Sequence, residues 1–131
     1  MEQYNNIHFL YVVDVDELME GTPLMKLRKK GTLEEGPYVT VNYSDLSRIL
    51  LLYLYGGVYF DLDVLSLSEF PESLPRNFAV AQGHTSVNNA VLRFVRKHPF
   101  LYLMMEEIVS CEVLNGPKNG PKHILPVLLK T

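Results

Sequence analysis

The chain has 131 residues, of which 47% are hydrophobic and 21% are charged, which indicates a single globular domain and excludes a disordered chain. Its formal net charge of −3 at pH 7 gives no general attraction to nucleic acid. No apolar run approaches the ~20 residues that span a bilayer, and no basic segment typical of a signal peptide begins the chain, so we expect a soluble chain. The single cysteine, Cys111, excludes an internal disulfide and is expected to be a small core residue.

The first part of the sequence predicts a strand followed by two short helices. Residues 7–13 are apolar and β-branched, which is typical of a strand. Residues 14–20 and 24–30 each have a helical pattern, and Gly21 and Gly31 follow them directly. Glycine after a helical pattern is a common helix end, so we expect each helix to stop there.

A buried helix and a strand are predicted in the middle of the sequence. Ser44 is a good N-cap, and residues 46–55 are apolar on nearly all sides, which favours a helix buried in the core. The glycine pair at 56–57 supplies a left-handed helix end. Residues 58–65 then form the next predicted strand.

The second half predicts one more strand and two helices. Residues 66–76 are a proline-containing connector, and residues 78–82 are a strand. A helical pattern extends from about Asn89 to residue 108, with a break or kink at Pro99, and a last helix begins near Pro121. The alternation of strands and helices indicates an α/β or α+β domain, in which ligands bind beyond the carboxyl ends of strands.

Two carboxylates, Asp61 and Asp63, are predicted at the carboxyl end of strand 58–65. Alternate residues of a strand face the same side, so both carboxylates would point together, opposite an apolar face at positions 58, 60, 62 and 64. Carboxylates ~6–7 Å apart repel each other by roughly 2–3 kcal/mol at an effective dielectric of about 20, which favours a compensating cation. Hard oxygen ligands suit Mg²⁺ or Mn²⁺, with water and phosphate oxygens completing the coordination. The alternative is a pair of solvated side chains at a strand end.

Asp45 and Arg48 share one face of the predicted helix, because residues three apart are neighbours on a helix. A helix start with this pair could hydrogen-bond a sugar through Asp45 and bind a charge through Arg48. The alternative is a local ion pair that contributes about 0.2–0.5 kcal/mol.

Together these residues resemble the glycosyltransferases that have a sugar-binding region with a DXD motif. The signature of that family is approximately S-D-x-x-R, an apolar helix, and then G-G-x-Y-x-D-x-D. The matching residues of this chain are Ser44, Asp45, Arg48, Gly56, Gly57, Tyr59, Asp61 and Asp63.

The animal α-1,4-galactosyl- and α-1,4-N-acetylglucosaminyltransferases are the most similar branch, with resemblance from about residue 7 to 130. Residues 88–100 resemble its N-G-x-x-x-F segment, with Asn88-Asn89 in place of Asn-Gly. Residues 120–125 resemble its G-P-x-x-[LI] segment, and the upstream residues 21–24 also resemble this branch of the family.

The resemblance implies an α/β fold of the GT-A type in which residues 1–131 are a partial catalytic domain, without the first βα units and the C-terminal segment. It implies Mn²⁺ (or Mg²⁺) and diphosphate held by Asp61 and Asp63, and a donor sugar bound by Asp45, Arg48 and Asn88. The implied reaction moves galactose or N-acetylglucosamine from a UDP-sugar to a glycolipid or glycan acceptor, in α-1,4 linkage and with retention. Members are Golgi membrane proteins, and no membrane span is expected within this chain.

Two alternatives stay open. Family members are usually much longer than this chain, so it could be a non-catalytic or decayed fragment of such a transferase. The haloacid-dehalogenase phosphatases also have Asp-x-Asp after an apolar strand. They normally follow it with threonine, where this chain has Val64, and they need a downstream lysine and an acidic pair.

Overall fold

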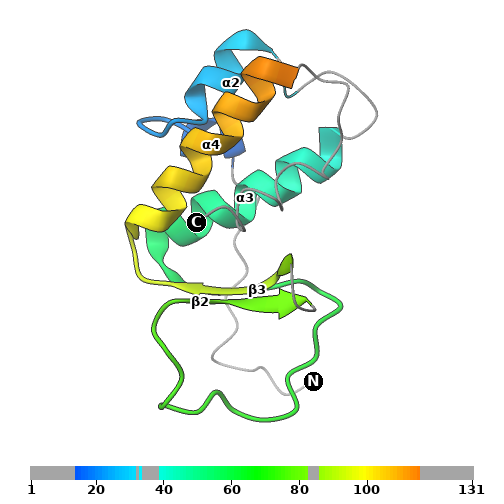
Figure 1. Cartoon of the computed structure of the whole chain (residues 1–131), viewed down its shortest axis with the longest axis vertical. Helices are drawn as coiled ribbons and strands as arrows, with labels where there is room; N and C mark the ends of the chain where they lie inside the picture. The colour runs from blue at the N-terminus through cyan, green and yellow to red at the C-terminus, as the bar shows by residue number, and fades with distance from the viewer. Residues whose placement is uncertain (1–13, 32, 34–38, 83–85, 116–131) are drawn as a thin grey trace.

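A computed structural model describes residues 14–31, 33, 39–82 and 86–115. The predicted strand at 7–13 and the predicted last helix near Pro121 lie outside these residues. The elements in chain order are α1 (Val15–Leu18), α2 (Met25–Lys30), α3 (Val39–Tyr55), β1 (Gly57–Phe60), β2 (Phe78–Gln82), β3 (Ser86–Phe94) and α4 (Pro99–Asn115) (Figure 1).

The two short N-terminal helices form where the sequence predicts them. The Asp14 side chain caps α1 by accepting a hydrogen bond from the Asp16 amide at 2.9 Å. Gly31 ends α2 with a φ of 69°, in the left-handed region that glycine adopts without strain. Gly21 also has a positive φ, of 71°, but the prediction that it ends the first helix is wrong, because α1 ends at Leu18 with Met19 as its C-cap.

Helix α3 is longer than the sequence predicts. It begins at Val39, so Ser44 lies inside the helix, and its prediction as the N-cap is wrong. The β-branched residues Val39, Thr40 and Val41 do not favour a helix locally, so the sequence pattern does not indicate the first turn of α3. The predicted end is confirmed, because Gly56 and Gly57 have φ values of 70° and 105°.

The sheet has the order β1-β3-β2, and both strand pairs are antiparallel. The prediction of a helix from Asn89 is wrong, because these residues belong to β3. In β3, Leu92 and Phe94 are buried whereas Val95 beyond the strand end is exposed, which is the period of two expected of a strand. The short apolar run fits either period, so the sequence pattern alone does not separate a helix from a strand here.

Strand β1 is shorter than the predicted strand at 58–65, because it ends at Phe60. The chain then turns, and the Val64 amide donates a hydrogen bond to the Asp61 carbonyl at 3.0 Å. The predicted strand at 78–82 is confirmed as β2. Pro99 is the first residue of α4 rather than a kink within a helix, a position where its missing amide hydrogen costs nothing.

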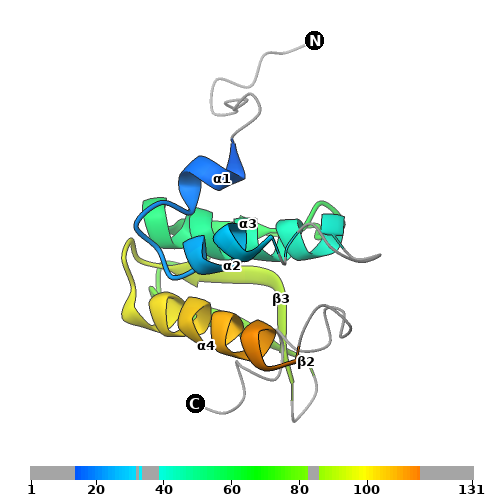
Figure 2. The same ribbon diagram turned by 90° about the horizontal axis from the view of Figure 1, so that it is seen from above.

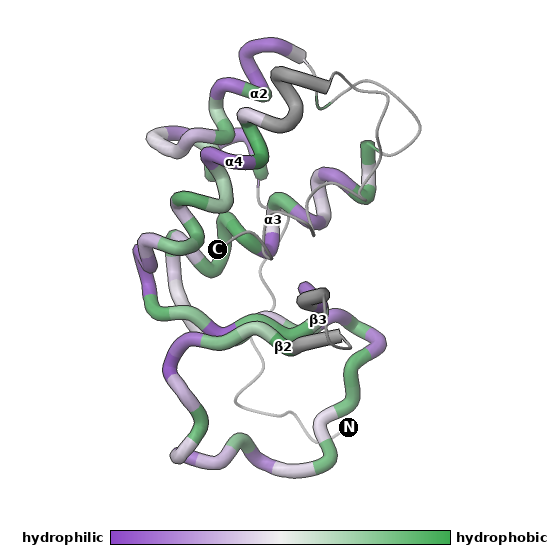
Figure 3. The backbone as a smooth tube through the Cα atoms, in the orientation of Figure 1, coloured by the Kyte–Doolittle hydropathy of each residue, from purple (hydrophilic) through white to green (hydrophobic). Residues whose placement is uncertain are grey.

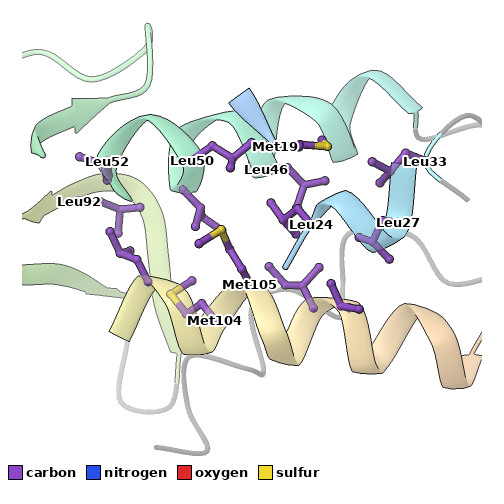
Figure 4. Close-up of a cluster of buried hydrophobic side chains, with 14 of the residues drawn as sticks. Met19, Leu24, Leu27, Leu33, Leu46, Leu50, Leu52, Leu92, Met104 and Met105 are labelled. Atoms are coloured by element: carbon purple, nitrogen blue, oxygen red, sulfur yellow. The ribbon is translucent and has the colours of Figure 1, made fainter. Parts of the chain in front are cut away.

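The core lies between α3, α2 and α4, and it continues to the face of the sheet that α3 covers (Figure 4). Figure 2 shows α2 and part of β3 between α3 and α4 in that view, and α4 is in contact with both α3 and α2. The largest fully buried side chains are Met19, Leu24, Leu27, Leu46, Leu50, Leu92, Leu101 and Met105. Among the described residues, none of the helices has both the length and the apolar character that crossing a membrane requires.

The segment between β1 and β2 lies apart from this core and contains exposed apolar residues (Figures 1 and 3). Leu62, Leu65 and Leu67 are almost fully exposed, and Phe60 is 37% exposed. The predicted apolar face at positions 58, 60, 62 and 64 is therefore not buried as a strand face, because the strand ends before Leu62.

Candidate functional site

Two residues predicted from the S-D-x-x-R pattern are buried where α3 faces the sheet. Asp45 is 8% exposed and Arg48 is 7% exposed. Arg48 Nη2 lies 3.1 Å from Asp45 Oδ1, and Arg48 Nη1 lies 3.1 Å from Oδ1 of Asp61. One guanidinium group therefore joins the helix to the first carboxylate of the Asp-x-Asp pair.

Asp61 is held by further contacts from the sheet. The Tyr59 hydroxyl donates a hydrogen bond to Asp61 Oδ1 at 2.7 Å, and the Asp61 amide donates to the Ala90 carbonyl at 2.9 Å. The Arg48 guanidinium carbon lies 4.9 Å from the centre of the Tyr59 ring, a distance at which a cation–π interaction forms. Asp61 thus has a fixed position, although it lies just beyond the end of β1.

Asn89 also contacts the buried ion pair, and the sequence does not predict it. Its Nδ2 donates to Asp45 Oδ1 at 3.1 Å, and its carbonyl accepts from Arg48 Nη1 at 3.2 Å. The Asn88 side chain accepts a hydrogen bond from the Ala90 amide at 2.7 Å, and its predicted contact with a donor sugar stays a prediction. No local pattern signals Asn89, because its contact with α3 depends on the irregular register between β2 and β3.

Burial and charge change the acidity of two groups at this site. Burial raises the pKa of Asp45, and nearby Asp61 adds to the rise, whereas Arg48 and the Asn89 hydrogen bond oppose it. Burial also raises the pKa of Tyr59, together with its hydrogen bond to Asp61. Arg48 thus compensates two carboxylates, so the Asp45–Arg48–Asp61 group keeps one excess negative charge when both are ionised.

Asp63 is in a different environment. It is exposed, and it lies in the turn after β1 rather than in a strand. The sequence predicts Asp61 and Asp63 in a strand, where strand alternation would point them to the same side. That reason is wrong, because neither residue belongs to β1.

The acidic residues fit a cation that brings its own further ligands. The described residues contain no group of three or more histidine, cysteine, aspartate or glutamate side chains that could hold a metal ion. Asp61 and Asp63 offer hard oxygen ligands, which suit Mg²⁺ or Mn²⁺. Two side chains are too few for a closed site, so water and ligand oxygens would have to complete the coordination.

An unpaired donor lies within the same cluster. Arg48 Nε is buried and has no hydrogen-bond partner among the residues that the structure describes. A buried donor without an acceptor costs about 1–3 kcal/mol, so this atom is suited to an acceptor group of a ligand. The cluster therefore combines hard carboxylate oxygens with a buried hydrogen-bond donor.

Known proteins with similar sequences are glycosyltransferases. The family described as the glycosyltransferase sugar-binding region containing DXD motif matches residues 4–80. The chain is 35% identical over 103 residues to human alpha-1,4-N-acetylglucosaminyltransferase, which covers 78% of this chain and 29% of that protein. It is 36% identical over 98 residues to rat lactosylceramide 4-alpha-galactosyltransferase, covering 75% of this chain and 27% of that protein. The chain thus spans less than a third of the length of these two relatives.

A solved structure has the same fold. The PaToxG glycosyltransferase matches with a TM-score of 0.63 at 23% sequence identity, covering 87% of this chain and 42% of that one. The prediction of a partial α/β fold of the GT-A type is confirmed. The comparisons favour the transferase prediction over the phosphatase alternative. The chain belongs to the family of glycosyltransferases whose sugar-binding region contains the DXD motif.

Proposed function

We propose that residues 1–131 are a partial catalytic domain that binds a nucleotide-sugar donor. The reaction is the retaining transfer of galactose or N-acetylglucosamine from a UDP-sugar to a glycolipid or glycan acceptor in α-1,4 linkage. The observation that carries the proposal is the position of Arg48, which contacts both Asp45 and Asp61 through its guanidinium. This contact joins the two halves of the family signature into one site.

In this proposal Asp61 and Asp63 hold Mn²⁺ (or Mg²⁺) together with the donor diphosphate. The contacts from Arg48 and Tyr59 both use Oδ1 of Asp61, which leaves Oδ2 as the oxygen for the cation. Asp63 is exposed and can reach a ligand without breaking a buried interaction. When bound, the metal would neutralise the charge that develops on the leaving diphosphate.

Asp45 and Arg48 would bind the donor sugar, with Asn88 nearby. A buried carboxylate accepts hydrogen bonds from sugar hydroxyls, and Arg48 Nε is a buried donor whose acceptor a sugar oxygen could supply. Burial excludes water from these groups and so strengthens each polar contact with the donor. We base the proposed acceptor class and the proposed location at the Golgi membrane on the relatives, one of which is named a lactosylceramide galactosyltransferase.

The test is calorimetry of the purified chain with UDP-galactose and with UDP-N-acetylglucosamine, with and without Mn²⁺. We expect binding that requires the metal and that is lost in the Asp61→Ala/Asp63→Ala variant. Glu69→Ala removes an exposed carboxylate of the β1–β2 connection and should leave binding unchanged. Absence of binding by a folded wild-type chain would contradict the proposal and favour a non-catalytic fragment. Binding that does not require the metal, or that persists in the Asp61→Ala/Asp63→Ala variant, would also contradict it.

A further inference from the structure

Asn89 holds both members of the buried ion pair. Its side chain donates a hydrogen bond to Asp45 Oδ1 at 3.1 Å, and its carbonyl accepts one from Arg48 Nη1 at 3.2 Å. Asp45 and Arg48 lie on α3, whereas Asn89 lies on β3, so these bonds connect the helix to the sheet at the site. Only the bond to Asp45 depends on which side chain occupies position 89.

An irregularity in β3 places Asn89 there. Ala79 of β2 pairs with Leu92, but the next residue, Val80, pairs with Asn88, so residues 89–91 of β3 have no partner in β2. On its other side β3 stays paired, because Val91 lies opposite Phe60 of β1. Extra residues in one strand bend it and redirect its side chains, and such bulges are over-represented beside active sites. At this point of the sheet the side-chain amide of Asn89 points to α3, where it donates to Asp45.

The bonds to Asp45 restrict its carboxylate. Its Oδ1 receives Arg48 Nη2 and Asn89 Nδ2, each at 3.1 Å. Two donors on one oxygen fix the rotation of the carboxylate and leave Oδ2 as the oxygen available to a ligand. A buried acceptor held in one orientation loses less freedom on binding than a rotating one, so its orientation affects affinity.

We propose that Asn89 is a positioning residue for the donor sugar, which acts by holding the Asp45 carboxylate in the orientation that receives a sugar hydroxyl. This inference rests on the proposed function, because Asp45 must contact the sugar for its orientation to matter. It concerns the sugar and not the nucleotide, since the Asn89 side chain contacts Asp45 and makes no described contact with Asp61 or Asp63.

The experiment compares UDP-galactose and UDP as ligands, in Mn²⁺, by calorimetry of the wild-type chain and of variants at position 89. Asn89→Ala removes the side-chain bond and keeps the carbonyl that holds Arg48. We expect its affinity for UDP-galactose to fall about tenfold, the effect of one hydrogen bond to a charged group, and its affinity for UDP to stay within about twofold. Asn89→Asp keeps the shape but places an acceptor against Asp45, so we expect a loss at least as large.

The control is Asn77→Ala, because Asn77 also supports this part of the chain without contacting the ion pair. Its Oδ1 accepts a hydrogen bond from the Val95 amide at 2.9 Å, just beyond the end of β3. We expect this variant to bind UDP-galactose and UDP as the wild type does. Thermal unfolding of each variant shows whether the fold is kept.

The outcomes separate the inference from the proposed function. Wild-type affinity for UDP-galactose in Asn89→Ala would overturn the inference alone. Equal losses for UDP and UDP-galactose, or loss of the fold in both variants at position 89, would show a structural role and would also overturn it. Failure of the wild-type chain to bind either ligand would overturn the proposed function and the inference together.

Discussion

The buried junction of α3 with β3 and the turn after β1 differ in how firmly the fold holds the carboxylates of the site. At the junction of α3 and β3, Asp45 is buried and bonded to Arg48 and Asn89. In the turn after β1, Asp63 is exposed. Asp61 lies between these extremes, since its backbone and its Oδ1 are both bonded to the sheet or to α3.

This difference indicates that the two acidic residues of the Asp-x-Asp motif have different tasks. Asp61 is bonded to α3 and to the sheet, so its replacement should affect both stability and binding. Asp63 has the freedom to adjust to a ligand, so its replacement should affect binding alone. This contrast can be tested by measuring stability, which requires no donor or acceptor substrate.

The largest effect is expected for Arg48→Ala. Removal of the guanidinium leaves Asp45 buried without its charged partner, and breaking a buried pair in this way costs about 3–5 kcal/mol. Urea unfolding gives the change in the free energy of unfolding. The matched control is Arg28→Ala, which breaks a pair with Asp16 between partly exposed side chains, 42% and 28% accessible, and should cost about 0–1 kcal/mol. Equal losses in the two variants would mean that the buried pair does not hold the site together.

Gly56→Ala should have the next largest effect, because Gly56 forms the turn that joins α3 to β1. A Cβ at this position would lie 2.6 Å from the Arg96 backbone nitrogen, and its φ of 70° already disfavours a side chain. Left-handed strain and the displaced backbone together should lower the free energy of unfolding by about 2–4 kcal/mol. Gly31→Ala, with a φ of 69° and nothing within 4 Å of the added Cβ, isolates the strain, which should be about 1–2 kcal/mol. If urea unfolding showed that Gly31→Ala lowers the free energy of unfolding as much as Gly56→Ala does, the close approach of Gly56 to Arg96 would not contribute to stability.

These examples show which features of the fold local sequence can predict. The end of α3 at Gly56 is predictable, since glycine's conformational freedom is a property of one residue. Arg48 and Asp61 stand out in the sequence because each is a charged residue next to an apolar segment, and the structure places them in contact. The start of α3 at Val39 is not predictable, because its first residues are β-branched and do not favour a helix. The strand at 86–94 is not predictable either, because its short apolar run fits a helix or a strand. Asn89 is the least accessible case, since its contact depends on an irregular register between two strands.

A smaller effect is expected when Asp61→Ala and Asp63→Ala are compared by their free energies of unfolding. Asp61→Ala leaves the Tyr59 hydroxyl and Arg48 Nη1 without this acceptor, which should cost about 1–3 kcal/mol in the free energy of unfolding. Asp63→Ala removes an exposed side chain and should stay within about 0.5 kcal/mol of the wild type. Chemical denaturation of both single variants gives the comparison, and a destabilised Asp63→Ala would contradict the division of tasks between the two residues.

The smallest effect is expected for the hydroxyl of Tyr59. Tyr59→Phe keeps the ring beneath Arg48 and removes only the hydrogen bond to Asp61, which should cost about 1 kcal/mol. The pKa of Tyr59 is raised in the folded chain, so the stability that this group contributes is fully present below its unfolded pKa of about 10. That stability is lost as the pH rises through the higher folded value, and the difference between wild type and Tyr59→Phe should therefore shrink only at alkaline pH. Tyr55→Phe, at a tyrosine that is 68% exposed, is the control and should stay within about 0.5 kcal/mol of the wild type in the free energy of unfolding.

The same tyrosine reports on Asp61 through its absorbance. Burial is the larger cause of the raised pKa and persists in Asp61→Asn, whereas the hydrogen bond to a charged acceptor does not. The pKa of Tyr59 should therefore fall in Asp61→Asn but stay above about 10, the ordinary value for tyrosine. Phenolate absorbance, taken as the difference between each protein and its Tyr59→Phe counterpart, isolates this group from the other tyrosines. An unchanged pKa in Asp61→Asn would mean that Tyr59 does not hold Asp61, and that Arg48 alone connects the turn after β1 to the buried half of the site.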